Sequence, residues 1–345
     1  MRHAASISSE LQLGVVGFGK LVRDYYLPAL RVLEGVQVAA VVDPLSESRR
    51  AAKKRLSKVE TFADYRAMIE QVRLDGVLVA SPPSTHLEIW TGTAGHGIPT
   101  FVEKPLLLSS QLSLLTTSNG NLRVMTDFNR RFWPMYNRAR ELVRQELIGT
   151  PIQLEFGLHL DVLRWSSVTA HRLDVDEGGL LHDLGPHAID LAIQIIGEEP
   201  ATISAVTSTE RWRDDHLQLR LSFRNGCSSI CNLAYGDRTR EWLVAHGPKG
   251  RIRLKEPNMM LHVESNGGWQ LPIAWLFDVA AFAYRGLRRS QSMGRASIQG
   301  ALTAFIRSLM TGTSFNPGLA DGLRNARWIA AAARSTTADS SPQQP

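Results

Sequence analysis

Near its start the chain passes from an apolar strand into closely spaced glycines and then into a helix. The apolar segment spans residues 11–16, and Gly17-Phe18-Gly19-Lys20-Leu21 follows at once. This order is typical of a dinucleotide-binding turn. Gly17 permits the tight turn, and Gly19 lets backbone N–H groups approach a pyrophosphate at the helix N-terminus. Val22 stands where the fingerprint prefers Gly or Ala, so we expect looser packing of this helix on the strand.

A second predicted strand, residues 36–43, ends on an acid, Asp43. A carboxylate at this place accepts hydrogen bonds from the ribose hydroxyls of NAD and repels the 2′-phosphate of NADP. Arg49 and Arg50 follow closely and offset part of that repulsion. We therefore expect NAD, with NADP as the alternative. The plainer interpretation of Asp43 is an ordinary turn with Pro44 at the end of a strand.

Strands and helices alternate through the first part of the chain. Further strands are predicted near residue 60 and at 74–80, 98–102 and 122–127, with helices between them. This alternation indicates an α/β fold, a doubly wound parallel sheet of the Rossmann type with helices on both faces. Ligands of such sheets bind at the carboxyl ends of the strands.

Two short segments follow predicted strands at this edge. Ser81, Pro82 and His86 follow the fourth strand, and Glu103-Lys104-Pro105 follows the fifth. We expect all of them near the cofactor. A lysine there can hydrogen-bond a substrate hydroxyl and stabilise an alkoxide-like oxygen during hydride transfer. The plainer interpretations are a histidine that starts a helix and a surface lysine after a strand.

The periodicity changes in the second half of the chain. Leucines alternate with polar residues over 216–224, Asn225-Gly226 then predicts a hairpin turn, and residues 227–235 return antiparallel. More strands are predicted at 152–163, 242–246, 251–255 and 259–264, and helices at 273–287, 296–310 and 319–333. This pattern indicates a second α/β domain with a large, open, mainly antiparallel sheet. We predict domains at 1–132 and 133–334, and a disordered tail at 335–345.

One polar segment, residues 177–191, carries Asp183 and His187 before a mostly apolar run. On a helix these two residues share a face, where a carboxylate can orient an imidazole that acts as a general base. Pro186 should kink or start the helix, which makes that spacing uncertain. The alternative interpretation is a capped, buried helix. A metal site using His182 as well is a poorer interpretation, because residues 182 and 187 diverge on a helix.

Composition excludes several classes of protein. The net charge is +6, and no basic run marks a nucleic-acid site. The two cysteines, Cys227 and Cys231, lie about 13 Å apart on a straight strand, too far for a disulfide there. A reducing cytoplasm fits this usage. The N-terminus lacks the apolar core of a signal peptide, and we expect no membrane insertion.

Several motifs together resemble the glucose-fructose oxidoreductase, inositol dehydrogenase and MocA family of NAD(P)-dependent oxidoreductases. They are the Gly17 turn, Asp43, the 80–86 segment, Glu103-Lys-Pro105, the 128–132 segment and the 178–190 segment. The resemblance implies a Rossmann domain, a domain with an open sheet, and a homodimer or homotetramer. By motif match it implies that Lys104, Asp183 and His187 form the catalytic group and also contact substrate. Tyr26 departs from the pattern, since close relatives often have His there.

The resemblance implies hydride transfer between the nicotinamide and a secondary carbinol carbon, with the oxygen-bound proton passing through His187. Side chains at the start of the second domain are candidates for substrate binding: Arg131, His159, Arg164, Trp165, His171 and Arg172. Arginines with a tryptophan suit a sugar, a sugar nucleotide or a cyclitol. The alternatives are a non-catalytic sensor that binds dinucleotide and sugar, and a dehydrogenase of a non-sugar diol.

Overall fold

The computed structural model describes residues 10–115, 122–162, 179–211, 214–255, 260–265, 268–269, 293–337 and 344. The chain divides into two compact units. The first unit comprises residues 1–107, 113–127 and 298–323, and the second comprises 108–112, 128–297 and 324–345. The first unit thus ends a few residues before the predicted boundary, and it also takes in a segment close to the C-terminus.

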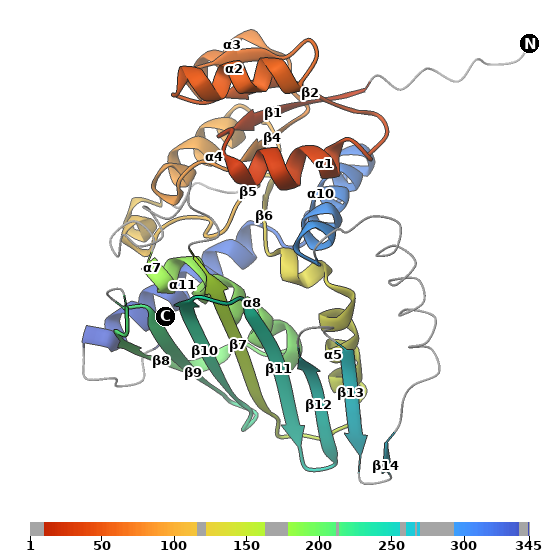
Figure 1. Cartoon of the computed structure of the whole chain (residues 1–345), viewed down its shortest axis with the longest axis vertical. Coiled ribbons are helices and arrows are strands. Elements are labelled where there is room, and N and C mark those ends of the chain that lie inside the picture. Colours follow the sequence, from red (N-terminus) through yellow and green to blue (C-terminus); the bar gives the residue numbers. More distant parts are fainter. Residues whose placement is uncertain are drawn as a thin grey trace, which may run out of the picture. The chain divides into compact units, whose positions relative to one another are not determined.

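The first unit contains a six-stranded parallel sheet in the order β3-β2-β1-β4-β5-β6 (Figure 1). The strands are β1 (Leu11–Val16), β2 (Val36–Val42), β3 (Glu60–Phe62), β4 (Gly76–Val79), β5 (Thr100–Val102) and β6 (Val124–Thr126). Burial on both faces explains why these strands are nearly continuous apolar runs. The order is that of the doubly wound dinucleotide-binding fold, so the predicted Rossmann sheet is confirmed.

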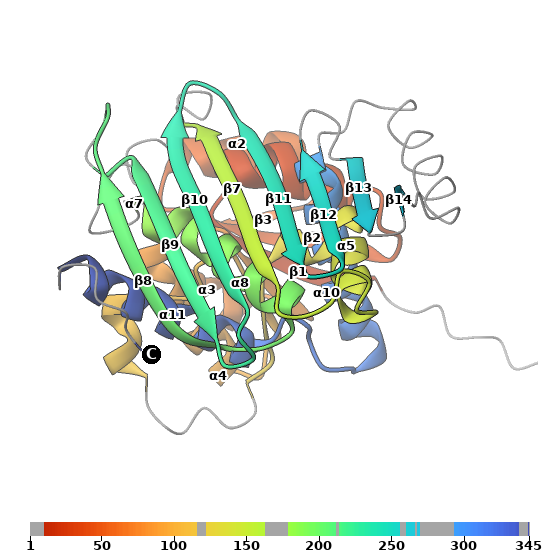
Figure 2. The same ribbon diagram turned by 90° about the horizontal axis from the view of Figure 1, so that it is seen from below.

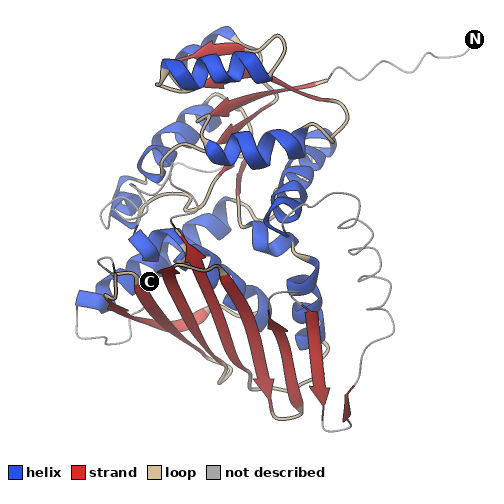
Figure 3. Cartoon of the chain, in the orientation of Figure 1, coloured by secondary structure: helices blue, strands red, loops and turns tan. Residues whose placement is uncertain are grey.

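Helices pack on this sheet, as Figure 3 shows by colour. They are α1 (Leu27–Leu30), α2 (Ser46–Arg55), α3 (Tyr65–Gln71), α4 (His86–Gly95) and α10 (Met293–Thr311), with 3-10 turns at η2 (Pro83–Thr85) and η3 (Ser109–Leu114). Asp64 caps α3 by accepting the N–H of Arg66 at 2.7 Å. Phe305 of α10 meets Phe101 of β5 edge-on, at 5.5 Å between ring centroids. This contact is part of the packing that places residues 298–311 of α10 in the first unit.

The helix after the glycine turn begins with a π-helical turn, η1 (Val22–Tyr26). It starts at Val22, the residue that stands where the fingerprint prefers Gly or Ala, and both Val22 and Tyr26 are fully buried. A π turn is wider than an α turn and is often found at functional sites.

The second unit contains an eight-stranded sheet in the order β14-β13-β12-β11-β7-β10-β9-β8, seen across its strands in Figure 2. The strands are β7 (Gln153–Asp161), β8 (Pro200–Ser208), β9 (His216–Phe223), β10 (Ser228–Gly236), β11 (Arg240–Gly247), β12 (Gly250–Lys255), β13 (Met260–Ser265) and β14 (Gly268–Trp269). All neighbouring pairs are antiparallel except β7 and β10. The predicted open, mainly antiparallel sheet is confirmed.

One face of this sheet carries the core of the second unit. The helices of the unit are η4 (Asn129–Phe132), α5 (Pro134–Arg144), α7 (Gly179–Asp183), α8 (Gly185–Ile196) and the larger part of α11 (Leu319–Thr337). On β9, Leu217, Leu219 and Leu221 are at most 2% exposed. Their alternation with polar residues therefore marks the packed face correctly.

A glycine and a tryptophan fit together on β7 and β11. Gly157 pairs with Trp242, and a Cβ at Gly157 would lie 2.0 Å from the indole ring. The indole Nε1–H donates to Glu155 at 2.9 Å, and His159 meets the ring edge-on at 5.1 Å. The absent side chain of Gly157 therefore lets the indole lie across the strand.

Residues 335–337, which were assigned to the predicted tail, belong to a helix. Helix α11 continues to Thr337, and Ser335 is fully buried, with its hydroxyl accepting the N–H of Ala205 at 2.8 Å. The helix expected at residues 273–287 lies outside the described residues. Cys227 and Cys231 are both free and buried. No described helix combines the length and the apolar character needed to cross a membrane.

Candidate functional site

The glycine turn of the first unit is closed against the loop that follows β4. Gly17 has a φ of +88°, and its N–H donates to Val42 O at 2.8 Å. A Cβ at Gly17 would lie 2.7 Å from Ala80 O and 2.9 Å from Ser81 N. Only glycine satisfies both the backbone angle and this close approach.

Asp43 holds the same turn from the end of β2. Its carboxylate accepts the N–H groups of Phe18 and Leu45, both at 2.9 Å. The side chain of Arg49 donates to the backbone carbonyls of Asp43 at 2.7 Å and Pro44 at 2.8 Å. The acid therefore couples the glycine turn to the second strand. Arg50 donates instead to Ser46, at 3.3 Å.

The turn has the features that a dinucleotide requires. A Cβ at Gly19 would meet no atom of the described residues within 4 Å, so the backbone there is open to a ligand. Lys20 and Leu21 lead into the helix, and Lys20 pairs with Asp24 at 2.8 Å. An exposed helix N-terminus with an acid at the neighbouring strand end fits a pyrophosphate and a ribose.

Substituting Gly17 by alanine should weaken NADH binding at least tenfold. The new methyl group would press on the Ala80 carbonyl, and a non-glycine residue at this φ costs about 1–3 kcal/mol of strain. If the turn shifts to relieve that strain, each loss of about 1.4 kcal/mol in binding free energy lowers the affinity tenfold. Titration by NADH fluorescence measures the effect. Gly95→Ala is the matched control, because a Cβ at Gly95 meets nothing within 4 Å. Equal affinity for both variants would contradict this role of the turn.

The predicted strand-end residues are brought together by His86. This side chain is 1% exposed; its Nδ1 lies 2.7 Å from Pro105 O and its Nε2 lies 2.9 Å from Ser81 O. Burial lowers the pKa of His86, although both carbonyl contacts oppose that change. His86 thus ties the Ser81-Pro82 turn to the segment that contains Lys104. The Lys104–Pro105 peptide bond is cis.

In the second unit, Asp183 ends α7 and His187 lies in the first turn of α8. Pro186 occupies that same first turn, as predicted for a proline that starts a helix. The Leu184 N–H still donates to Leu180 O at 2.9 Å, so the two helices follow one another with a short break. Asp183 is 8% exposed and His187 is 7% exposed. Both polar side chains are therefore held in a largely buried setting.

Tyr235 of β10 contacts Asp183, a partnership that the sequence did not indicate. The tyrosine hydroxyl donates to Asp183 Oδ2 at 3.1 Å, and Tyr235 is 3% exposed. The hydrogen bond fixes the carboxylate relative to the sheet.

Substituting Tyr235 by phenylalanine should reduce turnover about tenfold or more. A buried acceptor that loses its donor costs about 1–3 kcal/mol, and 1.4 kcal/mol is one factor of ten in rate. Steady-state kinetics with NAD and a polyol substrate measures this loss. Tyr25→Phe is the control at a tyrosine of the first unit. If Tyr235→Phe turns over like the wild type, Tyr235 does not orient the carboxylate.

Two buried ion pairs fix the segment that follows β6. Arg131 holds Asp190 of α8 through two nitrogens. Its Nε donates to Oδ2 at 2.9 Å and to Oδ1 at 3.2 Å, and its Nη2 donates to Oδ1 at 2.5 Å. Arg130 likewise holds Glu241 of β11, which also accepts the Tyr136 hydroxyl at 2.6 Å. Burial lowers the pKa of Arg130, but the charge and the hydrogen bonds of Glu241 outweigh burial and the pKa is raised.

The structure shows partners for two of the predicted substrate-binding residues, and for His182 of the metal alternative. Arg131 is engaged by Asp190, and His159 by the Trp242 ring. Burial lowers the pKa of His159. His182 Nε2 lies 3.0 Å from Ser109 Oγ. The other four candidates lie outside the described residues: Arg164, Trp165, His171 and Arg172.

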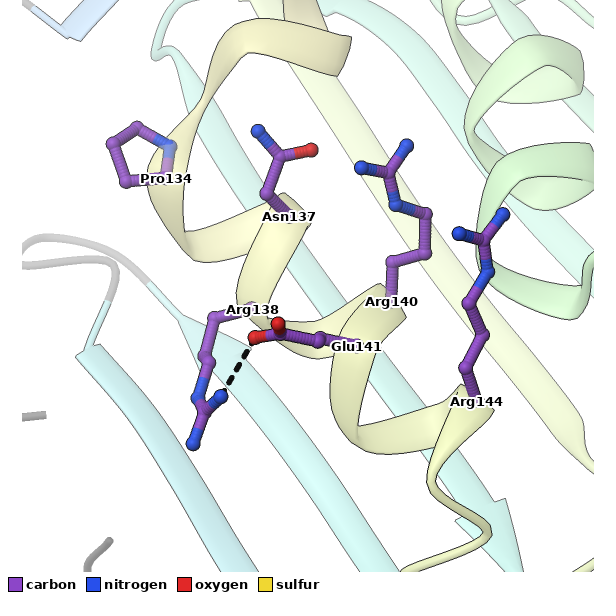
Figure 4. Close-up of a pocket in the computed structure, with 6 residues that line it drawn as sticks. All are labelled: Pro134, Asn137, Arg138, Arg140, Glu141 and Arg144. Carbon is purple, nitrogen blue, oxygen red and sulfur yellow. Dashed lines mark hydrogen bonds and ion pairs between the residues drawn. The ribbon is translucent and has the colours of Figure 1, made fainter. Parts of the chain in front are cut away.

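A surface pocket of about 420 Å³ runs along α5 (Figure 4). It is lined by Pro134, Asn137, Arg138, Arg140, Glu141 and Arg144. Arg138 pairs with Glu141 at 2.6 Å, and Arg140 donates to Gln194 at 3.2 Å. This pocket contains none of the predicted site residues. Among the described residues, no group of three or more His, Cys, Asp or Glu side chains is arranged to hold a metal ion.

The fold and the glycine turn define a two-domain protein with a dinucleotide-binding unit. Residues 11–115 match the model of the oxidoreductase family with an NAD-binding Rossmann fold, and residues 136–253 match the GFO/IDH/MocA C-terminal domain. The chain belongs to the Gfo/Idh/MocA family of NAD-dependent oxidoreductases. This finding confirms the resemblance seen in the motifs.

Relatives and solved structures agree with this membership. The chain is 27% identical to the rhizopine catabolism protein MocA of Rhizobium meliloti over 65% of this chain and 71% of that protein. It is 28% identical to myo-inositol 2-dehydrogenase of Thermotoga maritima over 70% of this chain and 74% of that protein. The structure of scyllo-inositol dehydrogenase from Lactobacillus casei with NAD(H) and scyllo-inositol matches with a TM-score of 0.78 at 19% identity, covering 96% of this chain and 98% of that one.

Proposed function

We propose that this protein is an NAD-dependent dehydrogenase of a secondary alcohol carried by a sugar, a sugar nucleotide or a cyclitol. The observation that carries the proposal lies in the second unit. Asp183 and His187, two side chains that can hold and transfer a proton, flank the start of α8 and are each less than a tenth exposed. In that setting a carboxylate and an imidazole interact more strongly than they do in water.

Three residues have proposed roles in the reaction. NAD, when bound, supplies the acceptor for a hydride from the carbinol carbon. His187 takes the hydroxyl proton as that C–H bond breaks, so the alcohol becomes a ketone. Lys104 donates a hydrogen bond to the oxygen on which charge develops, and Asp183 stabilises the protonated imidazole.

The cofactor preference is also part of the proposal. Asp43 at the end of β2 favours NAD, because its negative charge repels a 2′-phosphate. Arg49 opposes this less than the sequence suggested, since its guanidinium donates to the backbone carbonyls of Asp43 and Pro44. We therefore expect NADP to be used poorly.

The names of two similar proteins support the proposed substrate class. Proteins similar to this chain include two that are named for the oxidation of inositols. Cyclitols and sugars present several hydroxyl groups, which charged and hydrogen-bonding side chains at the start of the second unit can recognise. Assembly into a homodimer or homotetramer is part of the same proposal.

A substrate screen tests this function. The purified protein is mixed with NAD or NADP and with sugars, nucleotide sugars, inositols or simple diols, and reduced cofactor is followed by absorbance. We expect turnover with NAD on at least one cyclic polyol. Turnover of simple diols alone would favour the diol alternative. Tight cofactor binding with no turnover at all would favour the sensor.

A further inference from the structure

Two buried carboxyl groups, those of Glu103 and Asp127, follow neighbouring strands of the first unit. Glu103 is next to Lys104 in the sequence, and the charge of Lys104 acts on Asp127. Glu103 follows β5 and Asp127 follows β6, which pair in parallel. The Glu103 N–H donates to Val79 O at 2.9 Å, and the Asp127 N–H donates to Val102 O at 2.8 Å. The sheet therefore fixes both backbones. The two residues are only 9% and 1% exposed.

Tyr26 supplies one O–H group to these two carboxyls. Its hydroxyl donates to Glu103 Oε1 at 2.6 Å and lies 3.5 Å from Asp127 Oδ2. A phenol has a single proton to donate. Oδ1 of Asp127 is buried and meets no donor among the described residues. If both acids were ionised, two buried negative charges would therefore share this single phenol proton.

A proton on Asp127 removes one of these two charges. Burial raises the pKa of Asp127 well above its usual value, and the charge of Glu103 and a hydrogen bond to Glu103 raise it further. The charge of Lys104 acts in the opposite direction. Burial also raises the pKa of Tyr26, and the charges of Glu103 and Asp127 raise it further. The phenol therefore stays protonated. His86 is the other titratable group that interacts with Glu103 and Lys104.

We propose that Tyr26, Glu103 and Asp127 form a positioning cluster for Lys104, in which Asp127 keeps its proton and donates it to Glu103. The phenol and the acid then both donate to the Glu103 carboxylate. The cluster as a whole carries one negative charge, which balances the ammonium group of Lys104. The inference rests on the proposed function in so far as Lys104 contacts the substrate.

The cluster makes the stability of the protein depend on pH in a defined direction. A carboxyl whose pKa is raised in the folded state stabilises fully below its unfolded pKa of about 4, and this contribution is lost as the pH rises through the folded value. Asp127→Asn is neutral at every pH, so its melting temperature should fall less than that of the wild type as the pH rises. Parallel pH profiles of the two proteins would overturn the protonated state of Asp127.

Two charge-removing variants test the action on Lys104. The rate at which acetic anhydride acetylates Lys104 at one neutral pH is followed by mass spectrometry. Glu103→Gln should change this rate several-fold, because it removes the negative charge next to Lys104. Asp127→Asn should change the rate far less, because that acid is already neutral. Glu60→Gln, at an exposed acid on β3, is the control.

The outcomes separate this inference from the proposed function. Equal changes of the acetylation rate in both variants would mean that Asp127 is ionised, and no change in either would mean that the cluster does not act on Lys104; each result overturns the inference. Acetylation needs no substrate, so a failed polyol screen leaves this test intact. If Glu103→Gln does not fold, the infrared band of a protonated carboxyl is measured instead in the wild type and in Asp127→Asn. The band should be present in the wild type near neutral pH and absent in Asp127→Asn, and its absence from the wild type overturns the inference.

Discussion

Replacing His187 by alanine should lower turnover by about 10²–10⁴-fold and leave NADH affinity unchanged. A positioned general base contributes about that much to the rate, and cofactor binding depends on the glycine turn of the first unit. Steady-state kinetics gives the turnover, and NADH fluorescence gives the affinity. Lys104→Ala should behave in the same way, because it removes the donor to the developing oxyanion.

His182→Ala is the matched control for this experiment. His182 lies on the neighbouring helix α7 and contacts Ser109 Oγ at 3.0 Å. The proposed reaction gives it no proton to transfer, so its loss should change turnover only a few-fold. If His187→Ala instead turned over like the wild type while His182→Ala did not, the base would be assigned to the wrong histidine.

Replacing Asp190 by alanine should destabilise the protein by about 3–5 kcal/mol, the usual cost of leaving one charge of a buried ion pair without its partner. The Arg131 side chain is 7% exposed and that of Asp190 is 5% exposed. Hydrogen bonds from both Nε and Nη2 of Arg131 join them, so the guanidinium would lose its main counter-charge. Urea unfolding, followed by circular dichroism, measures the change.

The double variant Arg131→Met, Asp190→Leu is the control for the charge itself. It replaces both partners with apolar side chains of similar size, a change that is often neutral or stabilising for buried pairs. It should therefore recover most of the stability that Asp190→Ala loses. A double variant as unstable as Asp190→Ala would show that packing, rather than the uncompensated charge, causes the loss.

Local patterns predicted much of the fold. The alternation of Leu217, Leu219 and Leu221 with polar residues marks one face of β9, and a period of two fixes the buried face of a strand. Gly17 in the turn and Pro186 at the start of α8 have backbone requirements that can be read from the residue type itself. Strand β8 was missed, because its threonines and serines weaken the alternation.

Contacts between distant segments could not be predicted in this way. Tyr235 is an ordinary strand residue in the sequence, and only the pairing of β10 with β7 and β9 determines where its hydroxyl reaches. Arg131 pairs with Asp190, which lies 59 residues further along the chain, and no local pattern indicates that pairing. Ser335 was assigned to a disordered tail from its polar surroundings, and it is buried against β8. Each of these outcomes depends on tertiary packing.

Hydride transfer to NAD is tested most directly with a polyol that carries deuterium on its carbinol carbons. The protein, NAD and the deuterated form of a substrate found in the screen are incubated together, and the reduced cofactor is analysed by mass spectrometry. We predict that the reduced nicotinamide carries one deuterium, because the carbon-bound hydrogen moves as a hydride and does not exchange with water. Reduced cofactor without deuterium, or no reduced cofactor with any polyol, would contradict the proposed function.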